Sequence, residues 1–342
     1  MRAFVLTGPR KASVLDVEAP TPGQGQVVVD VHRVGFCGTD VEFFTGEMAY
    51  LHQGHAAYPL RLGHEWCGVV ASVGPGVTAE WVGRRVIGDT MLGCGTCYRC
   101  LDGRQHVCAL RYEVGIRRGW AGALAEQLLM PAPALRALPD SVDDTAGAMV
   151  EPGGNALRAV RGAGRIEGRR VLILGPGTIG LLSLQFALAA GAEVHVAGRT
   201  ASSLALATAL GAHGVSTADD LPDRAWDAVI DATNDAAVPA LALDLVEPGG
   251  RVVYIGLAGT PSLIDTRTLA LQDVTAVGVL SGSPGLDGTI EEYAAGRVDP
   301  RPLVAATVGL DQAADVLAGW RPEGAGPGPK IHIDPRLSGS ST

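Results

Sequence analysis

Positive charge is scarce in this chain. Lysine and arginine together number 27 against 36 aspartate and glutamate residues, which gives a formal net charge of −9. The only lysines are Lys11 and Lys330. Because a nucleic-acid-binding domain needs a basic patch, we expect no nucleic-acid partner. Aromatic residues make up only 5% of the chain, so we expect a core built from alanine, valine and leucine.

The amino terminus lacks the long apolar run of a signal peptide, and we therefore expect a cytoplasmic protein. In that compartment the six cysteines indicate metal binding or catalysis rather than disulfides. The 342 residues exceed the size at which a single core usually divides, which predicts two domains.

The segment from Val171 to Arg199 carries the clearest motif. An apolar strand runs into glycines spaced G-x-G-x-x-G and then into an apolar helix. This pattern predicts a strand, a tight turn and a helix whose amino terminus binds a pyrophosphate. The alternative is a membrane-spanning helix from Val171 to Ala192, which the internal Gly-Pro-Gly disfavours. The predicted cofactor residues of the turn are Gly175, Gly177, Thr178, Ile179 and Gly180.

Strands and helices continue to alternate after this segment, with strands near 215, over 226–232, 251–256 and 273–280. The alternation predicts an α/β fold with a doubly wound parallel sheet, the Rossmann arrangement. We expect a first domain over residues 1–154 and the nucleotide-binding domain over 155–285. Residues 286–342 are expected to return to the first domain.

Three separated residues could share one catalytic zinc. Cys37, His64 and Glu151 are all competent ligands, and a catalytic zinc takes three protein groups and keeps one open position. The alternative for Cys37 is an ordinary buried thiol. A second site is predicted where four cysteines cluster with the spacing C-x2-C-x2-C-x7-C, because four thiolates close a tetrahedral structural site. Its residues are Cys94, Cys97, Cys100 and Cys108.

The segment from Phe43 to Leu62 holds Tyr50, His52 and His55. One interpretation is an ordinary surface loop. The other is a loop that covers the substrate, with one or more of these three side chains in contact with it.

Together these motifs resemble the zinc-containing medium-chain dehydrogenase/reductases, especially the polyol, sugar and threonine dehydrogenases. The resemblance includes Gly35–Asp40, Gly63–Glu65, the cysteine quartet and Glu151–Pro152. It also includes the glycine turn and the closing Lys330–Pro335. It implies a GroES-like β-barrel catalytic domain beside the Rossmann domain, and two zinc ions per chain.

The resemblance also implies roles for single residues. Cys37, His64 and Glu151 would bind the catalytic zinc, with Glu65 as an alternate ligand or a neighbouring support. Asp40 would orient His64, and Thr39 would contact the substrate oxygen and begin a proton path.

Two positions depart from the family pattern. Glu42 stands where many members have a proton-relay histidine. Three interpretations stay open: Glu42 relays the proton, water relays it, or Glu42 contacts a hydroxylated substrate. The acidic residue expected at the end of the second Rossmann strand is replaced by Gly198, followed by Arg199 and Thr200. Because an arginine accommodates a 2′-phosphate, we favour NADP over NAD.

These expectations combine into a zinc-dependent oxidoreductase that transfers a hydride between NAD(P) and a secondary alcohol or ketone, such as a polyol, sugar or cyclitol. One alternative is an NADPH-dependent reductase of small aldehydes or ketones. Another is a non-catalytic cofactor-binding structural or regulatory protein. We expect a small-molecule substrate, no membrane partner, and a homodimer or homotetramer.

Overall fold

The computed structural model describes residues 1–337, which divide into two compact units. Of the described residues, unit 1 comprises 1–151, 304–326 and 330–337. Unit 2 comprises residues 152–303 and 327–329. Each unit has a hydrophobic cluster of its own, so each is described separately.

Unit 1 is built on a mainly antiparallel sheet whose strand order is β16-β17-β3-β4-β5-β9, with β8 also paired to β3. The long strand β3 carries the core, because Val27, Val29 and Val31 are fully buried. A separate hairpin pairs β1 with β2. The strands are β1 (Arg2–Gly8), β2 (Lys11–Asp16), β3 (Gln26–Gly35), β4 (Glu65–Val73), β5 (Arg85–Gly88), β8 (Gln127–Pro131), β9 (Leu135–Ala137), β16 (Val304–Gly309) and β17 (Lys330–Asp334).

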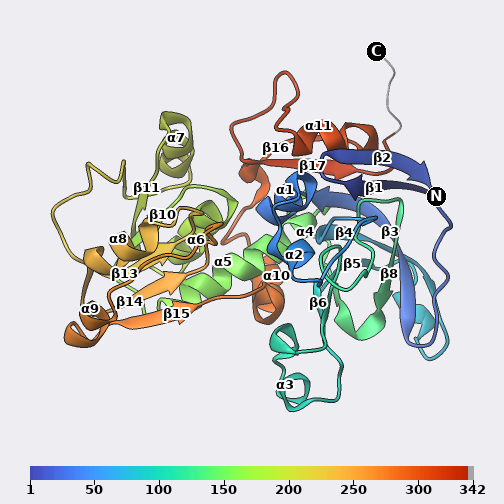
Figure 1. Cartoon of the computed structure of the whole chain (residues 1–342), viewed down its shortest axis with the longest axis horizontal. Coiled ribbons are helices and arrows are strands. Elements are labelled where there is room, and N and C mark those ends of the chain that lie inside the picture. Colours follow the sequence, from blue (N-terminus) through green and yellow to red (C-terminus); the bar gives the residue numbers. More distant parts are fainter. Residues whose placement is uncertain (338–342) are drawn as a thin grey trace. The chain divides into compact units, whose positions relative to one another are not determined.

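Short helices and one small lobe complete unit 1 (Figure 1). The lobe leaves the sheet through the two-stranded ribbon β6–β7 and contains α3, which Figure 1 shows away from the sheet. These elements are α1 (Gly38–Thr45), α2 (Ala49–His52), β6 (Met91–Leu92), α3 (Tyr98–Leu101), β7 (Tyr112–Glu113), α4 (Asp144–Ala148) and α11 (Ala313–Leu317).

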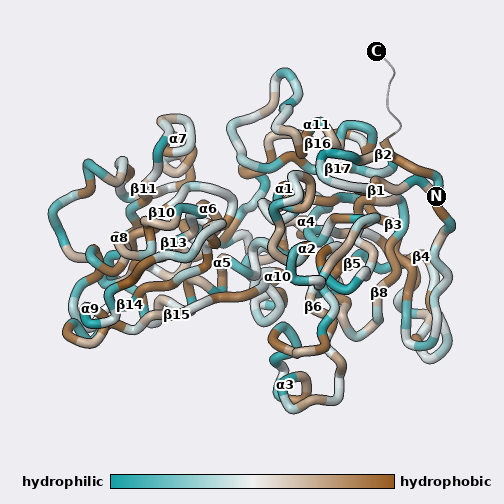
Figure 2. Tube along the Cα trace, viewed as in Figure 1, coloured by the Kyte–Doolittle hydropathy of each residue, from teal (hydrophilic) through white to brown (hydrophobic). Residues whose placement is uncertain are grey.

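Unit 2 contains the predicted parallel sheet, in the order β12-β11-β10-β13-β14-β15. Strand β10 lies between β11 and β13, so the strand order reverses there. Leu172 and Ile173 of β10 are fully buried, and Figure 2 shows the apolar centre of this sheet. The strands are β10 (Arg170–Leu174), β11 (Glu193–Ala197), β12 (Gly214–Ser216), β13 (Trp226–Asp231), β14 (Val246–Tyr254) and β15 (Thr275–Gly278). The helices are α5 (Val150–Gly162), α6 (Thr178–Ala189), α7 (Ala201–Ala209), α8 (Val238–Leu245), α9 (Thr266–Leu271) and α10 (Leu286–Ala294).

The segment from Val171 to Ala192 is not one long helix. It forms β10, a turn and α6, and within the described residues no helix is both long and apolar enough to span a membrane.

The division between the units differs from the expected one at two places. Helix α5 begins at Val150 rather than near Asn155. Helix α10 belongs to unit 2, because Tyr293 stacks on Phe186 of α6 with ring centroids 6.2 Å apart. The return to unit 1 therefore begins at Val304, with a strand, β16, that the sequence pattern did not reveal.

An ion cluster fastens α4 to the sheet of unit 1. The Asp144 carboxylate lies 2.9 Å from His32 Nδ1 and accepts a 3.1 Å bond from Arg85. The hydrogen bond from His32, followed by the charges of His32 and Arg85, lowers the pKa of Asp144 to about 2.

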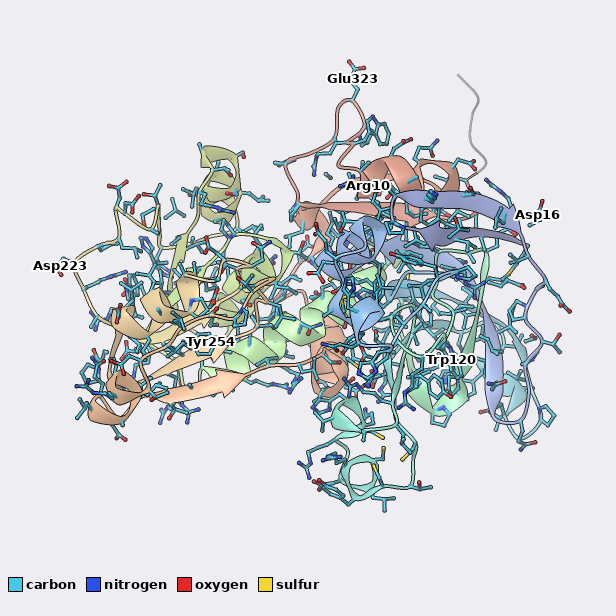
Figure 3. The ribbon with its side chains drawn as sticks, in the orientation of Figure 1. Arg10, Asp16, Trp120, Asp223, Tyr254 and Glu323 are labelled. Carbon is cyan, nitrogen blue, oxygen red and sulfur yellow. The ribbon has the colours of Figure 1, made fainter. Side chains whose placement is uncertain are left out.

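Replacing this carboxylate should produce a pH-dependent loss of stability. A pKa lowered from 3.8 to about 2 gives stability that is present above pH 3.8 and is lost as the pH falls toward 2. We expect Asp144→Asn to lower the free energy of unfolding by about 1 kcal/mol at pH 7, since the site is partly exposed, and by less in acid. Urea unfolding across this range measures it. Asp16→Asn, at an exposed position (Figure 3), is the control, and a pH-independent difference would contradict the account.

Candidate zinc and dinucleotide sites

The first site forms where β3 ends and α1 begins. Cys37 is the residue that precedes α1, and its backbone N–H donates to Asp40 Oδ2 at 2.8 Å. This bond fixes Asp40 within the first turn of the helix, where it is fully buried. The sequence pattern predicted the two residues but not the helix that orients them.

Strand pairing brings the second group of residues to the same place. Gly35 of β3 pairs with Glu65 of β4, which puts His64 and Glu65 beside Cys37. Ligand atoms of Cys37, His64 and Glu65 lie within 4.8 Å of one another. A side chain at Gly35 would collide with Glu65, since its Cβ would lie 2.4 Å from Oε2.

Asp40 faces the imidazole of His64. Their Oδ1 and Nδ1 atoms are 3.6 Å apart, and neither buried atom has a hydrogen-bond partner in the described residues. Burial opposes a charged imidazole, but Asp40 and then Cys37 outweigh burial, so the pKa of His64 is raised well above its usual value. Asp40 and Cys37 therefore favour positive charge at the imidazole.

Lys330 is a member of this site that the sequence analysis did not assign. Its Nζ donates to the Glu65 carboxylate, at 2.6 Å from Oε1, and to the backbone oxygen of Phe36. Burial disfavours its charge, yet Glu65, Cys37 and Asp40 keep its pKa above the usual value. One available signal was that Lys330 is one of only two lysines and lies in an apolar strand.

Thr39 and Glu42 lie near the site on α1, and Glu151 begins another helix. Thr39 Oγ1 is 3.9 Å from Cys37 Sγ. Glu42 is partly buried, and burial, followed by the charge of Glu47, raises its pKa. Glu151 is in the first turn of α5 and is not among the clustered ligand atoms of the described residues, so its role as a zinc ligand stays a prediction.

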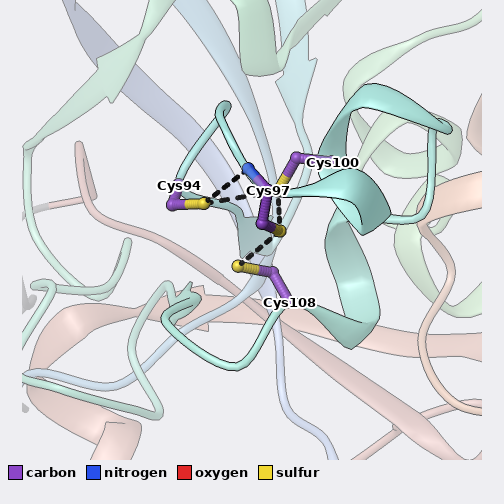
Figure 4. A group of neighbouring side chains, drawn as sticks. All are labelled: Cys94, Cys97, Cys100 and Cys108. Carbon is purple, nitrogen blue, oxygen red and sulfur yellow. Dashed lines mark hydrogen bonds between the residues drawn. The ribbon is translucent and has the colours of Figure 1, made fainter.

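The four predicted cysteines converge in the lobe. Their Sγ atoms are 3.9 Å apart for Cys94 and Cys100, 3.6 Å for Cys97 and Cys100, and 3.7 Å for Cys97 and Cys108 (Figure 4). These distances are too long for disulfides and match the edge of a sulfur tetrahedron around zinc, about 3.8 Å for Zn–S bonds of about 2.3 Å. The group fits a structural zinc.

The predicted substrate loop is held by contacts within unit 1. The Tyr50 hydroxyl donates to Glu113 at 3.3 Å and the His55 ring lies edge-on to Tyr50. His52 Nε2 is 3.0 Å from the backbone oxygen of Gly46. The Arg117 guanidinium lies over the Tyr50 ring, and its Nη2 atom is 3.4 Å from His55 Nε2. A substrate role for Tyr50, His52 or His55 stays a prediction.

The glycine turn of unit 2 has a separate reason for each glycine. Gly175 has φ +93°, a left-handed conformation that side chains rarely adopt. A Cβ at Gly177 would meet nothing within 4 Å, so the turn leaves open space there. A Cβ at Gly180 would lie 1.9 Å from the Gly175 oxygen, so only glycine lets α6 approach the strand. Thr178 and Ile179 fill the first turn of α6 between them.

A cavity of about 560 Å³ runs along the carboxyl edge of this sheet. It includes the turn at Gly175–Gly177 and, at the end of β11, Gly198, Arg199 and Thr200. The lining at the ends of β13 and β14 was not predicted from the sequence. There the Asp231 carboxylate accepts from the Thr233 N–H at 2.9 Å and from the Thr233 hydroxyl at 2.8 Å. In parallel sheets of this kind, dinucleotides bind at the carboxyl ends of the strands, at the point where the strand order reverses. The missed lining comprises Ala232, Thr233, Asn234, Asp235, Gly256 and Leu257.

Comparisons with known proteins identify the family of this chain. The family described as "Alcohol dehydrogenase GroES-like domain" matches residues 23–140, and "Zinc-binding dehydrogenase" matches residues 178–296. The L-threonine 3-dehydrogenase of Saccharopolyspora erythraea is 31% identical over 82% of this chain and 83% of its own. The chain belongs to the zinc-containing medium-chain dehydrogenase/reductase family.

Solved structures of this dehydrogenase family have the same fold over nearly the whole chain. A putative zinc-binding dehydrogenase from Sinorhizobium meliloti 1021, bound to NADP, is 29% identical with a TM-score of 0.88, covering 98% of this chain and 99% of its own. The alcohol dehydrogenase RspB from Escherichia coli CFT073, complexed with NADH, is 26% identical with the same TM-score and coverage. The expected fold class, a Rossmann sheet beside a GroES-like domain, is confirmed.

The two glycines of the turn provide a matched test of the dinucleotide site. Gly180→Ala should cost about 3 kcal/mol of unfolding free energy, because its Cβ would overlap the backbone of Gly175. Gly177→Ala should leave stability unchanged and weaken dinucleotide binding, because its Cβ projects into open space where the pyrophosphate approaches. Thermal unfolding and cofactor titration separate these effects. Equal stability of the two variants would contradict the assignment.

The Glu65–Lys330 pair predicts a large stability effect. Lys330→Met would leave a buried carboxylate without its cation, and we expect a loss of about 3–5 kcal/mol in urea unfolding. Glu65→Gln combined with Lys330→Met should lose less than Lys330→Met alone. Lys11→Met, at an exposed position, is the control. A loss no larger than that of the control would show that the pair does not support the fold.

Proposed function

We propose that this protein is a zinc-dependent oxidoreductase that transfers a hydride between NADP and a secondary alcohol or the matching ketone. The observation that carries the proposal is the cluster of the half-buried Cys37 with the buried His64 and Glu65, in a chain that also has a cavity at the glycine turn. Threonine dehydrogenase activity in a relative is consistent with a secondary alcohol as the substrate.

The donor set in unit 1 fits zinc. A thiol, an imidazole and a carboxylate are ligands that zinc prefers. Asp40 faces Nδ1 of His64, so the other ring nitrogen, Nε2, would bind the metal. Cys37 and His64 would hold the ion, with Glu65 or Glu151 as the third protein ligand. When bound, zinc supplies a Lewis acid that polarises a carbonyl and lowers the pKa of a hydroxyl group.

The chain's own side chains would position the substrate and move its proton. The Thr39 hydroxyl, beside the Cys37 thiol, would hydrogen-bond the reacting oxygen and hold the departing proton. Glu42, three residues later on the same helix, has a raised pKa, which suits a carboxyl group that accepts and returns a proton.

We propose a polyol, sugar or cyclitol as the substrate class. Glu42 replaces a relay histidine with a carboxylate, which can accept hydrogen bonds from additional hydroxyl groups of such a substrate. An NADPH-dependent reductase of small aldehydes or ketones is the alternative activity. The presence of Cys37, Thr39 and His64 together argues against a non-catalytic cofactor-binding protein.

NADP is the proposed cofactor because of the groups at the end of β11. Gly198 provides no carboxylate there, and the exposed Arg199 lines the cavity next to Thr200 and Ser203. Thr200 Oγ1 accepts from Ser203 N–H at 3.3 Å, which places two hydroxyl groups at the start of α7. A guanidinium and a helix amino terminus suit a 2′-phosphate.

We also propose a homodimer or homotetramer. Unit 2 exposes large apolar side chains outside the cavity lining, with Leu263 and Leu271 at 89% and 81% exposure. Apolar side chains exposed in this way favour a protein partner, and a second copy of the chain would bury them.

Metal analysis tests the zinc proposal. The purified protein should contain two zinc ions per chain, and Cys37→Ser should lose one of them together with activity. Cys100→Ser should lose the other and lower the melting temperature, because a closed four-thiol site supports folding. The control is Cys67→Ser, which should keep both ions. The Cys67 thiol is buried, donates to the backbone oxygen of Asp144 at 3.0 Å and belongs to neither group of ligands. One zinc in the wild-type protein would contradict a metal centre at Cys37.

Cofactor titration tests the NADP proposal. Arg199→Ala should weaken NADPH binding about tenfold or more, the effect of losing a charged hydrogen bond, and leave NADH binding unchanged. Arg165→Ala is the control, since this exposed arginine lines a different cavity, with the residues just before β10. Preference of the wild-type protein for NADH would overturn the cofactor assignment while leaving the fold and the metal sites intact.

A further inference from the structure

An arginine of α5 holds the loop that follows β15. Arg158 Nη1 donates to the backbone oxygen of Ser281 at 2.6 Å and also to that of Leu280. The side chain is half-buried, and burial lowers its pKa. A charged donor on two consecutive carbonyl groups fixes the direction of both peptide planes.

The loop has a backbone conformation that needs such support. Ser281 has φ +73°, in the left-handed region that favours glycine, and its side chain is buried. The Ser281 hydroxyl accepts from Ser283 N–H at 3.1 Å and lies 3.0 Å from the Ser283 hydroxyl. Non-glycine residues keep this conformation only where the surroundings impose it, and such positions cluster at ligand sites.

Backbone packing holds the other end of the loop against the same helix. A Cβ at Gly154 of α5 would lie 2.6 Å from the Gly282 oxygen, and a Cβ at Gly285 would lie 2.3 Å from the Gly154 oxygen. The two segments therefore touch without side chains between them. Arg158, one turn further along α5, bonds the part of the loop nearest to β15.

The position of the loop indicates what it contacts. The dinucleotide cavity is lined at the ends of β11, β10, β13 and β14, and β15 is the next strand of the sheet. Val279 N–H donates to the Tyr254 oxygen, so the loop leaves the sheet beside the end of β14. With the adenosine ribose at the end of β11 and the pyrophosphate at β10, the nicotinamide half extends toward β14 and β15.

We propose that Arg158 is a positioning residue for the nicotinamide half of the cofactor. It holds the Leu280–Ser283 loop so that the backbone of the loop meets that half, and it does not itself touch the cofactor. This inference rests on the proposed dinucleotide function and names a residue outside the cavity lining.

The test compares the whole cofactor with its adenosine half. Arg158→Gln should weaken NADPH binding about tenfold, because the loop, without its charged donor, would have to be ordered when the cofactor binds. Binding of adenosine 2′,5′-bisphosphate, measured by calorimetry, should stay within about twofold of the wild-type value, since that fragment occupies the β11 side. Arg158→Lys should retain part of the NADPH affinity, and Arg161→Gln, at an exposed position of the same helix, is the control.

The outcomes separate this proposal from the function on which it rests. The positioning role would be overturned if Arg158→Gln bound NADPH as tightly as the wild-type protein. It would also be overturned if the variant lost the same factor of affinity for NADPH and for adenosine 2′,5′-bisphosphate. If the wild-type protein binds NADH instead, the same comparison is made with NADH and ADP-ribose. Failure of the wild-type protein to bind NADPH, NADH and both fragments would overturn the proposed function itself. If Arg158→Gln does not fold, Arg158→Lys decides by the same ratio of affinities.

Discussion

The grouping of acidic and metal-ligating side chains at one point of unit 1 is the constraint on which its proposed zinc site depends. Asp40 and Glu65 are buried beside the half-buried Cys37, and the basic side chains that face them are His64 and Lys330. Burying charge is costly unless each group is paired, so the proposed zinc ion would complete the site by binding the thiol and the imidazole. The fold provides this grouping through the pairing of β3 with β4 and of β17 with β3.

In unit 2 the corresponding constraint is the shape of a parallel sheet edge. The strand ends carry glycines and short polar side chains, which leaves a cavity that can accept a long, charged ligand. Gly180 lets α6 begin close to β10, so that its free N–H groups face the place of the pyrophosphate. The proposed function thus separates two tasks, with metal chemistry in unit 1 and cofactor binding in unit 2.

Local motifs could be predicted from the sequence, and long-range contacts could not. The glycine turn and the cysteine quartet each lie within one short segment, so spacing alone identified their geometry. Lys330 pairs with Glu65 across 265 positions, and no local pattern reveals such a contact. For the same reason β16 was missed, because it is a strand only by pairing with β17.

The helix α1 was missed for a different reason. Its eight residues begin with Gly38 and include β-branched Thr39 and Val41, which have weak helix propensity. Two contacts support the helix instead: the hydrogen bond that the Asp40 carboxylate accepts from the Cys37 N–H, and the burial of Phe43 and Phe44. The expected boundary at residue 155 was displaced because α5 begins at Val150, five residues before the expected start of the helix.

The most direct measurement is zinc K-edge X-ray absorption on the wild-type protein. The account predicts a mixture of two environments, one of four sulfurs and one of a single sulfur with nitrogen and oxygen ligands. The average zinc shell should therefore contain both sulfur and lighter atoms. A spectrum of four sulfurs alone would show that Cys37 and His64 hold no metal, and would contradict the account.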